Sequence, residues 1–264
     1  MGILTLLTDF GTEDYYVAAV KGTVLSRAPG TEIVDVSHQV PPGDVETAAF
    51  LLAAAAPAFP AGTVHLAVVD PGVGSGRRIL LARTDRALYL APDNGLLTPF
   101  LPGARKVWSV EREDLFLPGP GRTFHGRDRF APVAAALLCG EPPEAMGPEI
   151  EDPRRLPGEP PRRERGRLTG RVVHVDRYGN LVTDIPAGWL PGGLCRFSVG
   201  SRSTTLFATH YAEIPPGEPA ALPGSLGTIE LSLRGDDLAR RWGVERGAPV
   251  NVAWRPDSLE QKEL

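Results

Sequence analysis

The first half of the chain alternates between short apolar runs and segments in which apolar residues recur with helical spacing. The apolar runs predict strands at residues 3–8, 32–36, 63–69 and 88–91, and the segments between them predict helices at 14–28, 45–56 and 129–139. Near-continuous apolar strands that alternate with helices are typical of a sheet covered on both faces. The pattern therefore predicts an α/β domain with a mostly parallel, Rossmann-like central sheet.

The pattern changes after about residue 140. Residues 141–166 contain seven prolines and many charges without apolar periodicity, which is typical of a linker or a long surface segment. Short β-type runs separated by Gly and Pro turns follow at 170–176, 181–185, 194–199, 203–207, 228–233 and 249–254, with one short helix at 236–242. We therefore expect an α/β N-terminal domain at 1–150, a Pro/Arg-rich linker at 151–167 and an all-β C-terminal barrel at 168–264.

Composition narrows the classes of function. With 42% hydrophobic residues the chain can bury a large core, and a net charge of −4 gives no reason to expect a nucleic-acid partner. Cys139 and Cys195 lie far apart, and no Cys or His spacing suggests a disulfide framework or a metal site. No run reaches the ~20 apolar residues that cross a bilayer. We expect a cytoplasmic protein with no membrane partner and no metal.

Two carboxylates follow predicted strands at glycine-containing turns. Asp9 follows the strand at 3–8, and Asp70 follows the strand at 63–69. In open α/β sheets, ligands bind outside the carboxyl ends of the strands. A carboxylate there can accept two hydrogen bonds from a ribose diol, but it can equally make a turn or cap a following helix. From these residues alone, both alternatives stay open.

A basic pair and a histidine complete the candidate chemistry. The loop at 71–76 resembles a phosphate-binding loop only loosely, because it lacks the Gly-Lys-Ser/Thr ending. Arg77 and Arg78 follow it, either as a fixed cation or as surface charges. His125, one of five histidines, stands between an aromatic residue and a glycine. If the fold brings Asp70, Arg77 and His125 together, an acid, a cation and a base converge on one small molecule.

The predicted barrel contains one polar turn with functional potential. Residues 176–180 read Asp-Arg-Tyr-Gly-Asn between two expected strands. Tyr178 could stack on a flat ring, and Asn180 could match an adenine edge. The same residues also form an ordinary hairpin turn, and without other observations the turn is the favoured interpretation.

Five motifs taken in order resemble a known family. They are Thr8-Asp9-Phe10-Gly11, Val69-Asp70-Pro71-Gly72-Val73-Gly74, Ala91-Pro92-Asp93-Asn94-Gly95-Leu96-Leu97, Thr123-Phe124-His125-Gly126-Arg127 and Asp176-Arg177-Tyr178-Gly179-Asn180. Together they resemble the S-adenosyl-L-methionine (SAM) hydrolases, also called SAM hydroxide adenosyltransferases, which are relatives of fluorinase and chlorinase. Each motif alone is weak, but their order is specific, and the resemblance extends from residue 3 to about 252.

The resemblance implies a reaction and a set of site residues. Water or hydroxide attacks C5′ of the ribose, and adenosine and L-methionine are formed. Asp70, Arg77 and His125 match the catalytic triad. Asp9 matches the ribose-binding carboxylate. The other candidate substrate-binding residues are Asp14, Asn94, Phe124, Asp176, Tyr178, Asn180, Ser225, Glu230 and Leu233. Gly224, Leu226 and Thr228 depart from the usual pattern, which leaves open the contacts at the adenine and methionine ends.

The branch of the family follows from Asp70. The halogenases carry a tyrosine at this position and lack the histidine, and a carboxylate there would repel a halide. The hydrolase is therefore the main hypothesis, with a halogenase and a non-catalytic adenosine- or SAM-binding protein as alternatives. The resemblance also implies that SAM is the substrate, that no cofactor is needed, and that the protein is a homotrimer with sites shared between neighbouring subunits.

Overall fold

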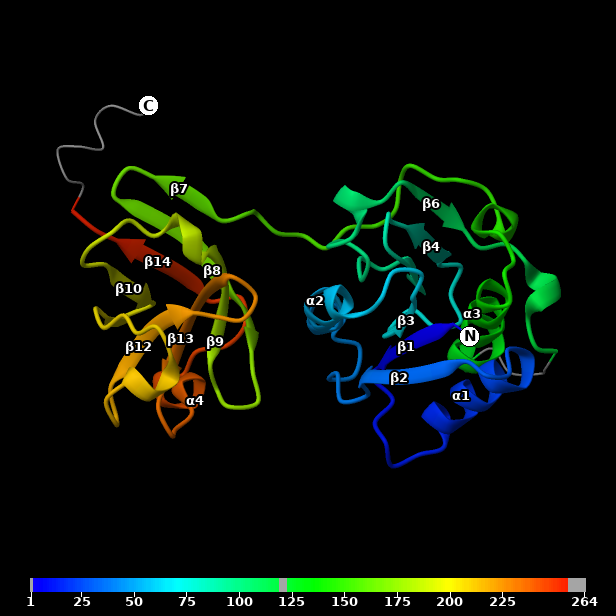
Figure 1. Cartoon of the computed structure of the whole chain (residues 1–264), viewed down its shortest axis with the longest axis horizontal. Helices are drawn as coiled ribbons and strands as arrows, with labels where there is room; N and C mark the ends of the chain where they lie inside the picture. The colour runs from blue at the N-terminus through cyan, green and yellow to red at the C-terminus, as the bar shows by residue number, and fades with distance from the viewer. Residues whose placement is uncertain (1, 119–122, 256–264) are drawn as a thin grey trace. The chain divides into compact units, whose positions relative to one another are not determined.

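The computed structural model describes residues 2–118 and 123–255 of the chain. It divides into two compact units, residues 1–157 and 158–264, and we describe each by itself (Figure 1). The point of division lies inside the proline-rich segment at 151–167. Within the described residues, no helix is long and apolar enough to cross a membrane.

Unit 1 contains a six-stranded sheet in the order β2-β1-β3-β5-β4-β6. The strands are β1 (Ile3–Thr8), β2 (Glu32–Ser37), β3 (Val64–Val68), β4 (Ile79–Arg83), β5 (Leu88–Pro92) and β6 (Lys106–Ser109). The pairs β1–β2, β1–β3 and β3–β5 are parallel, whereas β4 runs antiparallel to both β5 and β6. The expected mostly parallel sheet is therefore only partly right, because the tight turn at 84–87 reverses the chain between β4 and β5.

Helices cover both faces of this sheet (Figure 1). They are α1 (Tyr16–Arg27), α2 (Val45–Ala55) and α3 (Ala131–Leu138), with a π-helical turn at Gly126–Phe130 and short 3₁₀ turns at Ala56–Ala58, Leu101–Gly103, Glu113–Leu115 and Pro143–Met146. Alternate residues of the strands point to opposite faces. Leu4 and Leu6 of β1 therefore pack with α1 and α3, and Leu7 packs with α2, which gives two separate cores.

The strand order creates a place for a ligand in unit 1. The chain leaves β1 toward β2 on one side and returns to β3 on the other side, so the order reverses between β1 and β3. Thr8, the last residue of β1, pairs with Val68, the last residue of β3. The carboxyl ends of these two strands therefore open side by side at a topological switch point, where α/β sheets bind ligands.

Unit 2 contains an eight-stranded antiparallel sheet in the order β11-β10-β14-β8-β9-β13-β12, with β7 paired to β8. The elements are β7 (Arg162–Glu164), β8 (Arg167–Val175), β9 (Leu181–Pro186), β10 (Arg196–Val199), β11 (Arg202–Thr204), β12 (Pro219–Pro223), β13 (Thr228–Leu233), α4 (Leu238–Trp242) and β14 (Pro249–Ala253), with 3₁₀ turns at Ala187–Trp189 and Tyr211–Glu213. The sequence pattern did not predict β7 or β12. The strand predicted at 203–207 corresponds to β11, which ends at Thr204.

The sheet of unit 2 is curled into a nearly closed barrel. The two edge strands approach each other, since Thr204 Oγ1 donates to Pro219 O at 2.6 Å and Ala221 N donates to Leu206 O at 2.9 Å. Side chains from many strands fill the interior, among them Phe197, Leu231 and Val252.

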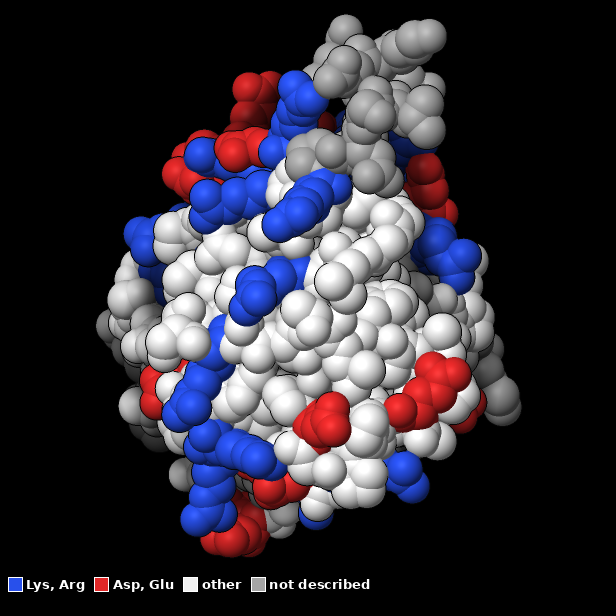
Figure 2. All heavy atoms as spheres, turned by 90° about the vertical axis from the view of Figure 1, so that its left-hand side faces the viewer, with Lys and Arg blue, Asp and Glu red and all other residues white. Residues whose placement is uncertain are grey.

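One face of unit 2 shows how its charges are distributed. Figure 2 shows Lys and Arg side chains in a band beside a broad area without charged side chains, with Asp and Glu side chains around that area. In the sheet itself, exposed Arg167 and Arg196 flank Ala253 across neighbouring strands. The basic residues of this face are therefore concentrated along a strip.

Candidate active site

Asp70 stands at the carboxyl end of β3, at the start of a tightly turned loop. Val73 N donates to Asp70 O at 3.2 Å, and Ser75 N and Oγ both donate to Gly72 O, at 3.1 and 2.7 Å. Gly74 has φ +84°, a left-handed conformation that favours glycine. These turns send the chain back on itself, so that Arg77 returns to the carboxylate that opens the loop.

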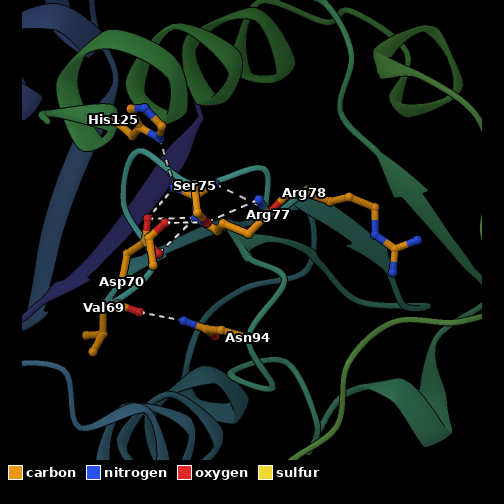
Figure 3. Close-up of polar contacts among 8 residues, drawn as sticks. Val69, Asp70, Ser75, Arg77, Arg78, Asn94 and His125 are labelled. Carbon is orange, nitrogen blue, oxygen red and sulfur yellow. Dashed lines mark hydrogen bonds and ion pairs between the residues drawn. The ribbon is translucent and has the colours of Figure 1, made fainter. Parts of the chain in front are cut away.

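Arg77 connects Asp70 and His125 (Figure 3). Its Nε donates to both Asp70 oxygens at 2.8 Å, and its Nη2 donates to Asp70 Oδ2 and, at 3.0 Å, to His125 Nδ1. The side chains of Arg77 and Asp70 are each only 6% exposed. The guanidinium also lies over the Phe130 ring, with Cζ 5.3 Å from the ring centroid. A bidentate, buried contact of this kind fixes the geometry of both partners.

The contact with Arg77 fixes the protonation of His125. A guanidinium can only donate, so the Nδ1 atom that receives its hydrogen bond carries no proton, and the neutral ring carries its proton on Nε2. Burial lowers the pKa of His125, and the positive Arg129 and Arg77 lower it further, against the opposing Asp70 and Asp128. Nε2 is buried without a hydrogen-bond partner among the described residues. At neutral pH this side chain is thus an uncharged imidazole.

A pocket of about 420 Å³ opens at the switch point between β1 and β3. It is lined by Asp9, Phe10, Tyr15, Tyr16, Val68, Asp70, Val73, Thr123, Phe124, His125 and Gly126. The rings of Phe10, Tyr15, Tyr16 and Phe124 form one cluster, with centroids 4.7 to 6.3 Å apart. A Cβ at Gly126 would lie 3.1 Å from the Phe10 ring, so glycine allows this wall to close. The volume suits a ligand of nucleoside size.

Asp9 contributes the second carboxylate of the pocket. Its Oδ2 accepts a hydrogen bond from Gly43 N at 2.8 Å, and its own backbone N–H also favours the charged carboxylate. Burial raises the pKa of Asp9, the negative Asp70 adds to the rise, and the Gly43 N–H opposes it. Asp9 neither caps α1 nor pairs with a cation among the described residues, so the alternative of a helix cap does not apply to it.

Three further sequence candidates of unit 1 lie outside the pocket lining. Arg78 points away from Arg77 (Figure 3) and binds Asp93 and Asp152, with nitrogen–oxygen distances of 2.7 Å to each. Asn94 Nδ2 donates to Val69 O at 2.8 Å and thereby holds the backbone just before Asp70. Asp14 is exposed.

The candidates of unit 2 fall into two groups. The turn at 176–180 is held by Asp176, whose carboxylate accepts from the backbone of Tyr178 and Asn180 and from Asn180 Nδ2. Tyr178 is 77% exposed, which leaves its ring free to contact a ligand. On β13, Glu230 is buried at the surface opposite the barrel core, whereas Leu233 is part of that core. Ser225 is exposed in the turn before β13.

Of the aromatic wall of the pocket, the sequence marked only Phe124 as functional and missed Phe10, Tyr15 and Tyr16. Tyr15 and Tyr16 lie between the turn after Asp9 and the body of α1, and they contact Phe124 from a distant segment. The adjacent pair of tyrosines just after a strand-end carboxylate was the available signal. Among the described residues, no group of His, Cys, Asp or Glu is arranged to hold a metal ion.

Comparisons with known proteins identify the family. The SAM hydroxide adenosyltransferase N-terminal domain matches residues 4–147, and the SAM hydroxide adenosyltransferase C-terminal domain matches residues 170–251. The chain belongs to the SAM hydroxide adenosyltransferase family. The order of the two domains agrees with the resemblance found in the sequence motifs.

Relatives within and beside the family cover nearly the whole chain. An "(R)-S-adenosyl-L-methionine hydrolase" of Thermus thermophilus is 42% identical, covering 93% of this chain and 97% of its own length. A fluorinase of Actinoplanes sp. is 31% identical, covering 95% of this chain and 97% of its own length. The crystal structure of an uncharacterized conserved protein from Thermotoga maritima superposes with a TM-score of 0.89 at 32% identity, over 95% of this chain and all of that one.

Proposed function

We propose that this protein hydrolyses S-adenosyl-L-methionine to adenosine and L-methionine. The observation that carries the proposal is the Arg77 guanidinium, which joins Asp70 and His125 beside a pocket of nucleoside size at the switch point of the sheet. Relatives named (R)-S-adenosyl-L-methionine hydrolase are 35 to 42% identical, and relatives named fluorinase are 27 to 31% identical. The hydrolase branch is thus the better supported one.

The walls of the pocket suit a cationic nucleoside. SAM carries a sulfonium cation, and the pocket offers two carboxylates, Asp9 and Asp70, together with the aromatic cluster of Phe10, Tyr15, Tyr16 and Phe124. Cations are attracted to aromatic faces, and a ribose diol can donate two hydrogen bonds to one carboxylate. Asp9, which lines the pocket and has one oxygen held by Gly43, is the candidate for the ribose.

The chemical step is an in-line displacement at C5′. The oxygen of a bound water forms a bond to C5′ while the C5′–S bond breaks, and the electron pair of that bond neutralises the sulfonium to give the thioether of methionine. The water loses one proton. Because no anion develops on the leaving group, the enzyme needs mainly to align the water opposite sulfur and to accept its proton.

Asp70 is the better candidate for the proton acceptor. The lone pair of His125 Nδ1 is engaged by Arg77, its Nε2 carries a proton, and its pKa is lowered. Each carboxylate oxygen can accept a second hydrogen bond, so Asp70 can hold a water while paired to Arg77. In this assignment Arg77 and His125 hold Asp70 and the water in place.

The direct test is to incubate purified protein with SAM in H₂¹⁸O and to follow adenosine and methionine by chromatography and mass spectrometry. The label is expected in the 5′-oxygen of adenosine. Binding of SAM without product over hours would instead favour a non-catalytic binder. A 5′-halogenated nucleoside formed at high chloride or fluoride would favour a halogenase.

Substitution of Asp70 tests the assignment of the base. Asp70→Asn keeps the shape and removes the basic oxygen, so turnover is expected to fall by ~10²–10⁴-fold, the usual contribution of a general base. Calorimetry should show that this variant still binds adenosine. Retention of full turnover would remove Asp70 from the mechanism.

Three further properties belong to the proposal. The enzyme needs no cofactor, so turnover should survive dialysis against a chelator. The protein is a homotrimer, as the family resemblance implies, so sedimentation should give three times the 28.2 kDa chain mass, and it is cytoplasmic, in keeping with its two separated cysteines. A chelator-sensitive activity or a monomeric mass would contradict the corresponding part.

A further inference from the structure

Strand β13 carries two polar residues on the surface opposite the barrel core. Ile229, Leu231 and Leu233 point into the core, and the strand alternation places Glu230 and Ser232 on the other surface. Neither polar side chain is open to solvent, because Glu230 is 6% exposed and Ser232 is fully buried. Something other than the barrel core therefore covers them.

The cover is the segment between β11 and β12, residues 206–214, which we call the strap. Ala208 N donates to Ala221 O at 2.9 Å, and Ala208 and Ile214 pack with residues of β12 in a small core of their own. A 3₁₀ turn, Tyr211–Glu213, forms its centre. Thr209 closes the turn, since its N and Oγ1 donate to Glu213 Oε2 at 2.7 and 2.9 Å.

The strap and the strand donate to the same oxygen of Glu230. The Tyr211 hydroxyl donates to Glu230 Oε1 at 2.6 Å, and Ser232 Oγ donates to it at 2.9 Å. Burial and the nearby Glu230 and Asp176 raise the pKa of Tyr211, which keeps its hydroxyl protonated. Tyr211 itself is half-exposed.

The other oxygen of Glu230 is left open. Among the described residues, Oε2 accepts no hydrogen bond, and no Lys, Arg or His pairs with the carboxylate. A Cβ at position 224 would lie 3.2 Å from Oε2, so Gly224 leaves room beside it. A buried carboxylate is costly unless it is paired or fully hydrogen-bonded. Two neutral hydroxyl donors satisfy one oxygen, and the second, which is not among the enclosed polar atoms without a partner, can accept from water or from a ligand.

We propose that Tyr211 is a positioning residue for substrate binding: with Ser232 it fixes Glu230 so that Oε2 accepts a nitrogen donor of the substrate. The inference rests on the proposed function, and it adds Tyr211, Ser232 and the strap to the binding machinery. SAM offers two such donors, the exocyclic amine of adenine and the α-ammonium of its methionine part. An acceptor-only carboxylate binds either.

The test compares Tyr211→Phe and Ser232→Ala with Ser198→Ala. Tyr211→Phe keeps the ring and removes the hydrogen bond to Glu230, whereas Ser198→Ala removes a hydrogen bond from β10 to Asn251 O, at 3.2 Å, that does not reach Glu230. Since a hydrogen bond to a charged group is lost, KM for SAM is expected to rise roughly 5–30-fold in Tyr211→Phe, with kcat changed less than about 2-fold. Ser232→Ala should act in the same direction, and Ser198→Ala should match the wild type.

Calorimetry with adenosine, inosine and L-methionine distinguishes the two donors. If the exocyclic amine binds Oε2, Tyr211→Phe weakens adenosine but not inosine, which lacks that amine. If the ammonium binds it, the variant weakens L-methionine alone. Unchanged KM and unchanged affinity for all three probes in folded Tyr211→Phe and Ser232→Ala would overturn the inference while leaving the hydrolase proposal intact. A wild type without turnover would overturn the hydrolase, and the calorimetry would still decide the role of Tyr211.

Discussion

The two candidate ligand-binding regions satisfy their carboxylates in opposite ways. In unit 1, Asp70 is paired with Arg77, and the same guanidinium reaches His125. In unit 2, Glu230 meets no cation among the described residues and is held through one oxygen by two hydroxyls. The Asp70–Arg77 ion pair keeps a fixed geometry whether or not a ligand is present, whereas the open oxygen of Glu230 is available to accept a hydrogen bond from a ligand.

This difference between Asp70 and Glu230 suggests that the unit 1 region carries out the chemical step and that the unit 2 region binds the substrate. Groups that are already fixed in the free protein can act on a transition state without reorganising. A carboxylate whose hydrogen bonds are completed only by the ligand stabilises the bound substrate and the transition state equally. Its loss therefore raises KM and leaves kcat nearly unchanged. Substitutions in the unit 1 pocket should therefore lower kcat, and substitutions around Glu230 should raise KM.

After Asp70→Asn, the largest effect is expected for Arg77→Lys. Lysine keeps the charge but lacks the planar fork that donates to both Asp70 and His125, so kcat should fall by ~10²–10³-fold. The matched control is the adjacent Arg78→Lys, because that side chain points to Asp93 and Asp152 instead (Figure 3). Single-turnover rates of adenosine formation make the comparison. Equal losses in the two variants would contradict the catalytic assignment of Arg77.

The next effect concerns a buried carboxylate that belongs to neither region. Asp93 is 3% exposed, pairs with Arg78, and accepts from Arg154 N at 2.7 Å, which ties residues 152–154 to unit 1. Asp93→Asn leaves Arg78 short of its partner, so unit 1 should lose about 2–4 kcal/mol of stability, measured by urea unfolding, while kcat stays within a few-fold.

Its control is the exposed pair between Asp85 and Arg105. Asp85→Asn should leave the unfolding midpoint unchanged, since exposed pairs are screened by water. If Asp93→Asn abolished turnover in protein that remained folded, the division between structural and catalytic charge pairs in unit 1 would be wrong.

A smaller effect tests the unit 2 side of the comparison. Glu230→Gln keeps the hydrogen-bonding shape but replaces a carboxylate by an amide, so KM for SAM should rise by ~10-fold with kcat nearly unchanged. The exposed Glu218→Gln in the same unit is the control. A drop in kcat with constant KM would place Glu230 with the catalytic groups instead.

The strand pattern predicted the positions of Asp9 and Asp70 well. Each follows an apolar run that the structure confirms as β1 or β3, and strand ends of this kind meet at one edge of a sheet. The pattern did not predict β4, Ile79–Arg83, which follows the two arginines directly, or β6, Lys106–Ser109. That omission made the sheet seem mostly parallel.

Side-chain direction and tertiary cover could not be predicted from the sequence. Arg77 and Arg78 are chemically identical neighbours, and only the turn at 70–77 decides which of them meets Asp70. His125 lies far from both in sequence. Nothing in the sequence marks Tyr211 as a partner of Glu230. The alternation of β13 predicts that Glu230 faces outward, and only the strap buries it.

The smallest expected effect concerns His65, a buried residue with a shifted pKa that lies outside the candidate active site. It tests whether such a pKa shift must mark a functional residue. His65, near the start of β3, is buried against Tyr89 and bonded to Thr5 Oγ1 at 2.7 Å, and burial lowers its pKa to about 4. The unfolded chain binds a proton to this residue near pH 6.5, whereas the folded protein does so only near pH 4. Stability contributed by neutral His65 is therefore present above pH 6.5 and is lost as the pH falls toward 4.

Between pH 6.5 and 5.5 this single group should lower the stability of unit 1 by about 1 kcal/mol. His65→Gln should flatten that slope in urea unfolding, although it destabilises the core at every pH, and the exposed His210→Gln should leave the slope unchanged. Because His65 lies at the opposite end of β3 from Asp70, turnover at pH 8 should persist in the folded variant. Loss of turnover there would mean that the pocket depends on more of unit 1 than the groups that line it.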